Sequence, residues 1–256
     1  MVSLDIFFSL SKTWTQSYRA DWMYMVPPFL AYYAVDKGNQ QLLQDTITQI
    51  SLYREILQSN DTGIWMHIIG PESQDEGHWA TGNAWAAAGM TRVLATVLKA
   101  NNNRIINPLW QRQTVNLLTG YIKEIIDGAI DVSQDGGLLG NYLDDVSGDG
   151  LGFGEISGSS LLAATVYRMA VLQPRVFDAS YVAWADQIRT TLGGNDANGN
   201  PHVTADGIAT PAVNPLWWKD TNPYTQGSPE GQAFVVMMYT GWRDCVVAGR
   251  CSPVSW

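Results

Sequence analysis

The sequence has few basic residues and no long hydrophobic run near its start, and each shortage excludes a class of protein. Its 256 residues include 15 Lys and Arg against 24 Asp and Glu, for a formal net charge of −9. Nucleic-acid-binding proteins neutralise phosphates with clustered basic residues, so we expect no nucleic-acid partner. The apolar stretch Ile6-Phe7-Phe8 is too short for a signal peptide or a membrane span. We expect no membrane partner either.

Cysteine is also scarce. Cys245 and Cys251 lie six residues apart, with Gly249 between them. They are close enough to form a small disulfide loop, but they are not spaced as a pair of metal ligands. A disulfide agrees weakly with an extracellular protein, and two free thiols fit the spacing nearly as well. The compartment stays open, and no pattern calls for a metal or another cofactor.

What the sequence does contain is helical periodicity, which predicts an all-α protein. Asn107 before Pro108 and Ser228 before Pro229 each place a side-chain acceptor ahead of a proline suited to the first helical turn. A hydrophobic content of 46% supports a single globular domain over residues 1–256. Apolar residues share one helical face within 43–57, 86–97, 115–125, 162–169, 181–192 and 235–242.

A glycine-containing loop pattern recurs at residues 61–64, 135–138 and 206–208. Each loop precedes a helix entry rich in small residues, at 81–83, 157–159 and 227–229. This repetition predicts helical hairpins whose long loops gather on one face. With a unit of roughly 72 residues, the chain holds about three and a half hairpins.

Four motifs occur in a fixed order. Asp-Trp-Met-Tyr-Met-Val-Pro-Pro-Phe-Leu begins at Asp21, and the others span residues 63–67, 79–85 and 227–234. Together they resemble the six-hairpin glycosidase family of unsaturated rhamnogalacturonyl and unsaturated glucuronyl hydrolases. This resemblance implies an (α/α)6 toroid, here incomplete, with the chain as its C-terminal part and without the N-terminal hairpins.

The resemblance also implies a reaction, hydration of the C4=C5 bond of a 4,5-unsaturated uronic acid at the non-reducing end of pectin-derived oligosaccharides. Protonation at C4 creates an oxocarbenium-like centre at C5, water adds there, and the hemiketal opens and expels the next sugar. One carboxyl group can donate the first proton and then activate the water, so two flanking carboxylates are not required. Asp21 is the candidate acid and base, and its apolar neighbours Trp22 and Met23 would disfavour the ionised form. The alternative is an Asp that caps a helix.

The same motifs supply candidate sugar contacts. Aromatic rings pack against sugar faces, and a loop histidine can reach a hydroxyl or a carboxylate. Thr81 stands where the family motif has an arginine, which removes a cation suited to carboxylate recognition, so His67, His78 or Arg19 would have to replace it. The candidate oligosaccharide-binding residues are His67, Trp79, Thr81, Asn83, Trp85 and Tyr24.

Other acidic residues receive structural interpretations. Glu155 and Glu230 begin helices, where a carboxylate complements the helix dipole. The cluster of Asp144, Asp145 and Asp149 lacks the regular spacing of calcium ligands and is expected to be a solvated loop.

Two further functions stay open. One is a non-catalytic carbohydrate-binding remnant. The other is a six-hairpin glycosidase that acts on neutral sugars with two carboxylates, which Thr81 favours and a second carboxyl near Asp21 would support.

The first hairpin should have an unpartnered flank. A chain that starts within the ring leaves Trp22, Phe29, Tyr32 and Tyr33 without their neighbouring hairpin, and such an apolar flank seldom stays exposed. We therefore expect an incomplete product of a longer protein, or self-association through this edge.

Overall fold

The computed structural model describes residues 17–100, 106–145 and 151–253, and regular structure in these ranges is almost entirely helical. The all-α prediction is confirmed. Two antiparallel pairs of two-residue strands join loops, β1 (Tyr18–Arg19) with β2 (Ile68–Ile69) and β3 (Gln134–Asp135) with β4 (Leu138–Leu139). The helices are α1 (Trp22–Met25), α2 (Pro27–Asp36), α3 (Gln40–Leu57), α4 (Ala80–Lys99), α5 (Pro108–Asp131), α6 (Ile156–Leu172), α7 (Ala179–Leu192) and α8 (Pro229–Val247).

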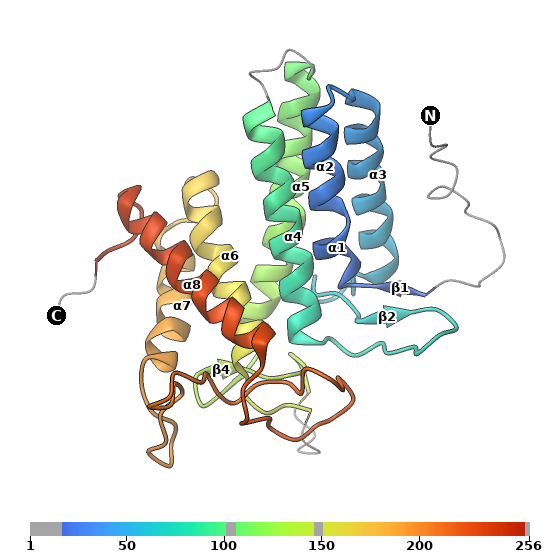
Figure 1. Cartoon of the computed structure of the whole chain (residues 1–256). Helices are drawn as coiled ribbons and strands as arrows, with labels where there is room; N and C mark the ends of the chain where they lie inside the picture. Colours follow the sequence, from blue (N-terminus) through green and yellow to red (C-terminus); the bar gives the residue numbers. More distant parts are fainter. Residues whose placement is uncertain (1–16, 101–105, 146–150, 254–256) are drawn as a thin grey trace.

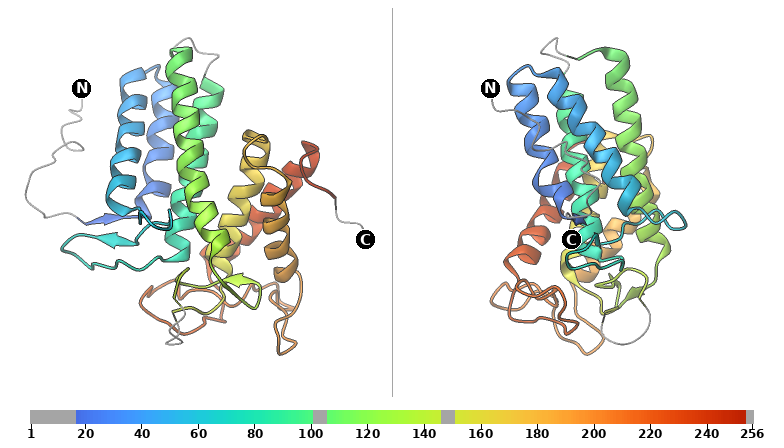
Figure 2. Two further views of the ribbon diagram at one scale, coloured as in Figure 1. Left: turned by 180° about the vertical axis from the view of Figure 1, so that it is seen from behind. Right: turned by 90° about the vertical axis from the view of Figure 1, so that its right-hand side faces the viewer.

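The helices lie in two layers. One contains α2, α4, α6 and α8, and the other contains α3, α5 and α7, as Figure 1 and the rear view in Figure 2 show. Consecutive helices therefore form hairpins that cross between the layers. Within the second layer, Arg54 Nε donates to Glu124 Oε2 at 2.7 Å, and the Tyr181 hydroxyl donates to Asp127 at 2.7 Å. Repeated crossing hairpins of this kind are the architecture of part of an (α/α)6 toroid.

Side-chain caps fix where several helices begin. Asn107 accepts hydrogen bonds from the backbone of Leu109 and Trp110 at the start of α5, and Ser228 accepts one from Gly231 at the start of α8. Both predicted caps are confirmed. Glu155 caps α6 in the same way, because its carboxylate accepts bonds from two of the N–H groups that a helix start leaves unpaired.

The long loops gather at the end where α4, α6 and α8 begin, at the bottom of Figure 1. This agrees with the prediction from the repeats. The first turns of these helices approach closely: a Cβ on Gly158 would lie 2.6 Å from Ala80 Cβ, and one on Gly231 would lie 2.8 Å from Ser157 Oγ. Only glycine permits such contacts. The three helix starts therefore form a compact base beneath the loops.

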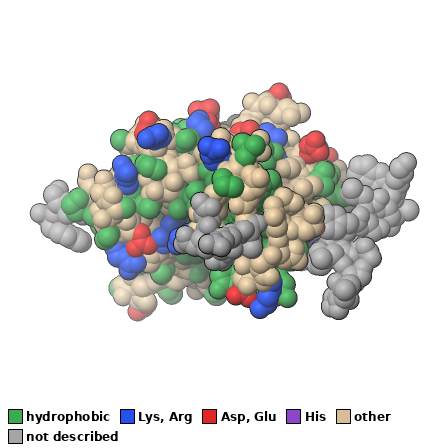
Figure 3. Space-filling model, turned by 90° about the horizontal axis from the view of Figure 1, so that it is seen from above, with side chains coloured by type: hydrophobic (Ala, Val, Ile, Leu, Met, Phe, Trp, Pro, Cys, Tyr) green, Lys and Arg blue, Asp and Glu red, His purple; other side chains and the backbone are tan. Residues whose placement is uncertain are grey.

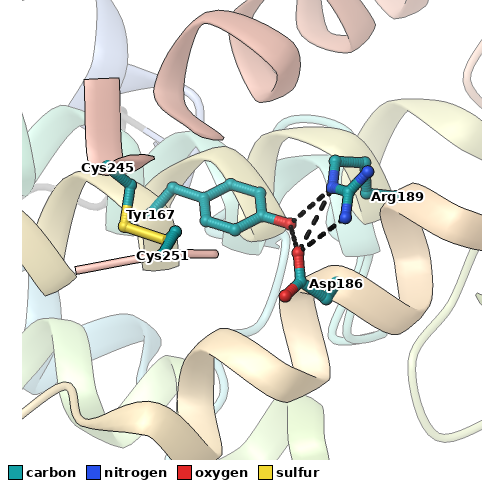
Figure 4. Close-up of a disulfide and its surroundings, with 5 residues drawn as sticks. All are labelled: Tyr167, Asp186, Arg189, Cys245 and Cys251. Carbon is teal, nitrogen blue, oxygen red and sulfur yellow. Dashed lines mark hydrogen bonds and ion pairs between the residues drawn. A yellow bond between two sulfur atoms is a disulfide. The ribbon is translucent and has the colours of Figure 1, made fainter. Parts of the chain in front are cut away.

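A disulfide joins the last turn of α8 to the segment that follows it. Cys245 and Cys251 are bonded to each other, which decides between the two alternatives that the sequence left open. Nearby, the Tyr167 hydroxyl on α6 donates to Asp186 on α7 at 2.7 Å, and Arg189 joins the same group (Figure 4). These bonds tie α6 and α7 together next to the C-terminal segment.

The flank of the first hairpin is only partly as predicted. Phe29, Tyr32 and Tyr33 are exposed, with 63% and 68% of Phe29 and Tyr32 accessible. Trp22 is not part of this edge, because its ring stacks on Tyr53 of α3 at 4.1 Å. Self-association through the edge stays a prediction.

The end of the molecule opposite the long loops carries interspersed charges. Lys and Arg side chains alternate there with Asp and Glu, and neither sign gathers into an extended patch (Figure 3). Within the described ranges, no helix is both long and apolar enough to cross a bilayer.

Candidate active site

Asp21 lies at the loop face, immediately before α1. Its side chain makes no capping hydrogen bond, so the structure does not support the interpretation of Asp21 as a helix cap. Instead, Asp21 Oδ1 lies 3.6 Å from His67 Nε2, and Asp21 Oδ2 lies 3.6 Å from Arg19 Nε. The pairing of β1 with β2 produces this contact, because it aligns Arg19 with Ile68 and lets Ala20 N donate to the His67 carbonyl at 3.0 Å.

Two of the aromatic neighbours of Asp21 in the sequence contact other helices. The Trp22 ring stacks on Tyr53 of α3, and the Tyr24 hydroxyl reaches Met237 Sδ of α8 at 3.7 Å. Successive side chains of a helix point in different directions, so these two rings diverge from Asp21. The side chains paired with Asp21 are those of Arg19 and His67.

His67 is fully buried, and Asp75 holds its other ring nitrogen. His67 Nδ1 donates to Asp75 Oδ2 at 2.8 Å, and this carboxylate also accepts bonds from the Tyr142 hydroxyl at 2.6 Å and from Gly77 N at 3.1 Å. Burial opposes charge on His67, but the hydrogen bonds and charges of Asp21 and Asp75 outweigh it and raise the pKa of His67. His67 therefore lies between two carboxylates, hydrogen-bonded to Asp75 and 3.6 Å from Asp21.

Burial likewise opposes charge on Asp75, yet the hydrogen bonds from His67, Tyr142 and Gly77 lower the pKa of Asp75. Asp75 is thus the ionised partner that orients the imidazole and leaves His67 Nε2 directed at Asp21. His67 Nε2 and Asp21 Oδ1 are buried and have no hydrogen-bond partner within the described residues. The two atoms face each other across a short gap.

Aromatic rings enclose the histidine. The Trp79 ring lies 4.5 Å from the His67 ring, and the Trp218 ring meets His67 edge-on at 4.8 Å. Trp85 packs edge to face on Trp79 at 5.6 Å. Asp21, His67, Trp79 and Trp85 therefore lie together, but none of them lines the open cleft beside the histidine. That the four line one sugar-binding pocket stays a prediction.

Three other residues that were predicted to contact sugar have different surroundings. Asn83 is fully buried, and both of its amide hydrogens go to backbone carbonyls, those of Trp65 and Trp79. Thr81 is buried in the first turn of α4 and has no partner for its hydroxyl within the described residues. Tyr24 lines a separate groove beside Arg92. Asn83 therefore supports the loop, and Tyr24 faces a different groove. Sugar contacts by these three residues stay a prediction.

An open cleft adjoins the histidine. It has a volume of about 640 Å³ and is lined by three loops, which contribute Asp75 from the first, Tyr142 and Asp144 from the second, and Trp218 and Lys219 from the third. Pockets of roughly 300–1,000 Å³ accommodate small ligands. The ammonium of Lys219 lies 5.2 Å from the centre of the Trp218 ring. The cleft thus combines aromatic rings with hydrogen-bond acceptors and one cation.

The predicted acidic loop takes part in this cleft. Asp144 Oδ2 accepts a hydrogen bond from His78 Nδ1 at 2.6 Å, while Asp149 lies outside the described residues. His78 is therefore held by Asp144, whereas Arg19 and His67, the other two proposed substitutes for the missing arginine, lie beside Asp21.

A second carboxyl group also belongs to this region. Burial, and then the charge of Asp21, raise the pKa of Glu230 to about 7, so Glu230 lies near enough to Asp21 to sense its charge. The sequence had suggested only a helix-dipole role for it. Asp75, Trp218 and Lys219 were also missed, although the Trp217-Trp218 pair in a polar loop was a signal that could have been followed.

Comparisons with known proteins identify the family and the fold. The model of Glycosyl Hydrolase Family 88 matches residues 7–242. No curated protein matches. A possible GH105 family member from Salmonella enterica superposes with a TM-score of 0.70 at 18% identity, covering 90% of this chain and 57% of that one.

Two further solved structures are similar. A possible GH105 family member from Klebsiella pneumoniae gives a TM-score of 0.69 at 20% identity, covering 89% of this chain and 56% of that one. The unsaturated glucuronyl hydrolase of Bacillus sp. GL1, responsible for the degradation of glycosaminoglycan, gives 0.63 at 12% identity, with 90% and 59% covered. The chain spans less than two thirds of each, and at these identities the likeness shows the toroid fold.

Proposed function

The chain belongs to Glycosyl Hydrolase Family 88, and on that premise we propose that it hydrates the C4=C5 bond of a 4,5-unsaturated uronic acid. The sugar would stand at the non-reducing end of a pectin-derived oligosaccharide. The observation that carries the proposal is the facing pair of Asp21 Oδ1 and His67 Nε2, 3.6 Å apart and both without hydrogen-bond partners within the described residues. An unsatisfied buried polar group is costly, so the placement of these two atoms opposite each other supports a functional role for the pair.

Asp21 acts first as the acid and then as the base. Its proton passes to C4, the electron pair of the double bond forms the new C–H bond, and positive charge develops at C5 and the ring oxygen. The Asp21 carboxylate then takes a proton from the water that adds at C5. The hemiketal opens to a ketone, and the hemiacetal left at C1 expels the next sugar. Asp21 regains its proton and the cycle closes.

His67 and Arg19 lie beside the reacting carboxyl group. The carboxylates of Asp21 and Asp75 raise the pKa of His67, and Arg19 is half-exposed. Both can compensate the carboxylate that the substrate carries. The cleft lined by Tyr142, Trp218 and Lys219 adjoins them and offers rings on which the following sugar can pack.

The test is turnover by the 256-residue chain. The C4=C5 bond conjugated with the carboxylate absorbs in the near ultraviolet, and hydration removes that absorbance. We expect the absorbance of an unsaturated galacturonyl disaccharide to decline and one equivalent of the second sugar to appear. A folded preparation that releases no sugar from any unsaturated uronide would contradict the proposal.

A second candidate is a glycosidase of neutral sugars that uses two carboxylates. One observation in its favour is Glu230, whose pKa responds to the charge of Asp21. Another is that the cleft contains the carboxylates of Asp75 and Asp144, which would repel an anionic ligand. Release of 4-nitrophenol from neutral 4-nitrophenyl glycosides, with no loss of absorbance from unsaturated uronides, would establish this function instead.

A further inference from the structure

We infer that the start of α4 is the subsite for the carboxylate of the substrate, formed by the Thr81 hydroxyl, the N–H groups of the first turn and His67 Nε2. The inference deepens the proposed function and rests on it for the identity of the ligand. Thr81 stands where the family motif has an arginine, so a neutral hydroxyl and a helix start take over a task for which a cation is suited.

The first turn of α4 has N–H groups that lack partners. A helix start leaves its first N–H groups without acceptors inside the helix, and Trp79, at the cap position of this 20-residue helix, makes no side-chain capping bond. Ala80 N donates to the Asn141 carbonyl at 2.8 Å. Thr81 N and Gly82 N have no hydrogen-bond partner among the described residues. These two donors and the positive end of the helix dipole favour an anion at this place.

Thr81 lies on the face of α4 between the neighbouring helices α6 and α1. Successive residues of a helix are rotated by about 100°. Ala80 faces the start of α6, since a Cβ on Gly158 would lie 2.6 Å from Ala80 Cβ. Two residues later, a Cβ on Gly82 would lie 3.4 Å from the Cβ of Ala20, just before α1. The intervening Thr81 therefore points between these two contacts.

His67 meets the same turn of α4. A Cβ on Gly82 would also lie 3.7 Å from His67 Cδ2, which is the ring carbon bonded to Nε2. This edge of the imidazole thus faces both the first turn of α4 and Asp21 Oδ1, which lies 3.6 Å from Nε2. His67 is fully buried, and its Nε2 has no hydrogen-bond partner within the described residues. An unpartnered buried nitrogen beside a helix start points independently to a ligand.

The Thr81 hydroxyl is another buried group without a partner in the part of the chain that the structure describes. Thr91, further along α4, is also buried but donates its hydroxyl to the Ala87 carbonyl at 2.9 Å, a common arrangement within helices. Thr81 lacks this option, because the carbonyl four residues earlier belongs to Gly77 and accepts a bond from elsewhere. A buried unpaired hydroxyl is costly, and a ligand oxygen at this place would remove that cost.

These donors suit a carboxylate better than a neutral group. The hydroxyl and the N–H groups can each donate to a carboxylate oxygen, and Nε2 donates as well when His67 carries its second proton. Asp21 is paired with Arg19 and is the more accessible neighbour, since 22% of its side chain is exposed, so the ligand enters beside it. The substrate carboxylate is attached to C5, and binding it here holds the C4=C5 bond next to Asp21.

Binding without turnover tests the inference. D-Galacturonate is the probe and D-galactose its neutral counterpart, and chemical-shift titration of the nitrogen-15-labelled chain gives the dissociation constants. We expect galacturonate to bind at least roughly fivefold more tightly than galactose, the effect of about one hydrogen bond, in the wild type and in Thr81→Ser. The preference should disappear in Thr81→Val. The matched control is Thr119→Val, because Thr119 of α5 is also buried with an unpartnered hydroxyl among the described residues.

Two results of this titration would overturn the inference. One is a wild-type chain that binds galacturonate no more tightly than galactose, and the other is a Thr81→Val variant that keeps the preference. Thermal unfolding separates ligand binding from a role in the fold. Loss of an unpartnered buried hydroxyl should leave the Tm unchanged or raise it in both valine variants. A lower Tm in Thr81→Val alone would show that the hydroxyl serves the fold, against the inference.

Kinetics on an unsaturated disaccharide distinguish this inference from the proposed function. We expect Thr81→Val to raise KM roughly fivefold with a smaller effect on kcat, because a contact made before and during the reaction is lost. Turnover with an unchanged KM in Thr81→Val would overturn the inference and leave the proposed function in place. A wild-type chain that binds galacturonate through Thr81 but releases no sugar would contradict the proposed function, and the carboxylate subsite would stand without it.

Discussion

Asp75 accepts a hydrogen bond from His67 Nδ1 at 2.8 Å, and this bond determines which edge of the imidazole faces Asp21. The pair couples a residue in an exposed polar loop to the centre of the candidate site. Replacing Asp75 should therefore change the chemistry of His67 even though Asp75 contacts no reacting atom.

The variant Asp75→Asn tests that coupling. Loss of the carboxylate removes a charge and a strong acceptor that raise the pKa of His67, so we expect this pKa to fall. We also expect kcat/KM to drop roughly 100-fold, because the imidazole is no longer held in position. Proton–nitrogen NMR of the imidazole measures the titration. A His67 that titrates as in the wild type would contradict this account.

Trp218→Ala should expose His67. The Trp218 ring meets the His67 ring edge-on, and the Lys219 ammonium lies over the face of the Trp218 ring. We expect Trp218→Ala to raise KM several-fold, because the ring contact that is lost contributes about 1 kcal/mol to binding. The substitution should also speed the modification of His67 by diethyl pyrocarbonate, and peptide mass mapping measures the rate of this modification. The neighbouring Trp217→Ala is the matched control, since Trp217 is exposed. Equal modification rates in the two variants would show that Trp218 does not protect His67.

Asn83→Ala distinguishes a supporting residue from a sugar contact. The Asn83 amide pairs with the backbone of Trp65 and Trp79, and leaving these groups unpaired should lower the free energy of unfolding by about 2–3 kcal/mol. Thermal unfolding measures this loss, and Asn116→Ala, on the exposed face of α5, should show none. A raised KM at unchanged stability would indicate instead that Asn83 contacts the sugar.

Glu155 should make stability depend on pH. Burial is the main cause that raises its pKa to about 7, above the value in the unfolded chain. The folded state therefore binds this proton more tightly, so the contribution to stability is fully present below about pH 4.5 and is lost as the pH rises through about 7.

We expect Glu155→Gln to remove much of this pH dependence, on the order of 3 kcal/mol, leaving a smaller slope from Glu230. Urea unfolding at pH 4.5 and pH 8 provides the measurement, with Glu55→Gln, whose carboxyl is exposed on α3, as the control. Parallel pH curves for wild type and Glu155→Gln would mean that Glu155 does not titrate in this range.

The fold was largely predictable because its signals are local. Helical periodicity and the caps Asn107 and Ser228 depend on residues close in sequence, and the structure confirms them. The grouping of Asp21 with His67 also followed from motif order. The orientation of Tyr24 did not, because it depends on the helical phase of α1 against α8.

The remaining features of the site depend on tertiary contacts that a linear pattern does not encode. Asp75 is one acid among several in a polar loop, and only the folded loop places it on His67. Trp218 reaches the same histidine from a loop far along the chain. Glu230 was interpreted through its own helix, whereas its raised pKa depends on burial and on the charge of Asp21.

The most direct test of the central claim is the absorbance of an unsaturated galacturonyl disaccharide in the presence of Asp21→Asn. Asn retains the shape of the side chain and cannot supply the proton, so we expect the initial rate to fall at least about 100-fold with unchanged thermal unfolding. The control Asp131→Asn, at an exposed position at the end of α5, should keep the wild-type rate. An Asp21→Asn variant that removes the absorbance as fast as an active wild-type chain would contradict the assignment of Asp21 as the acid and base.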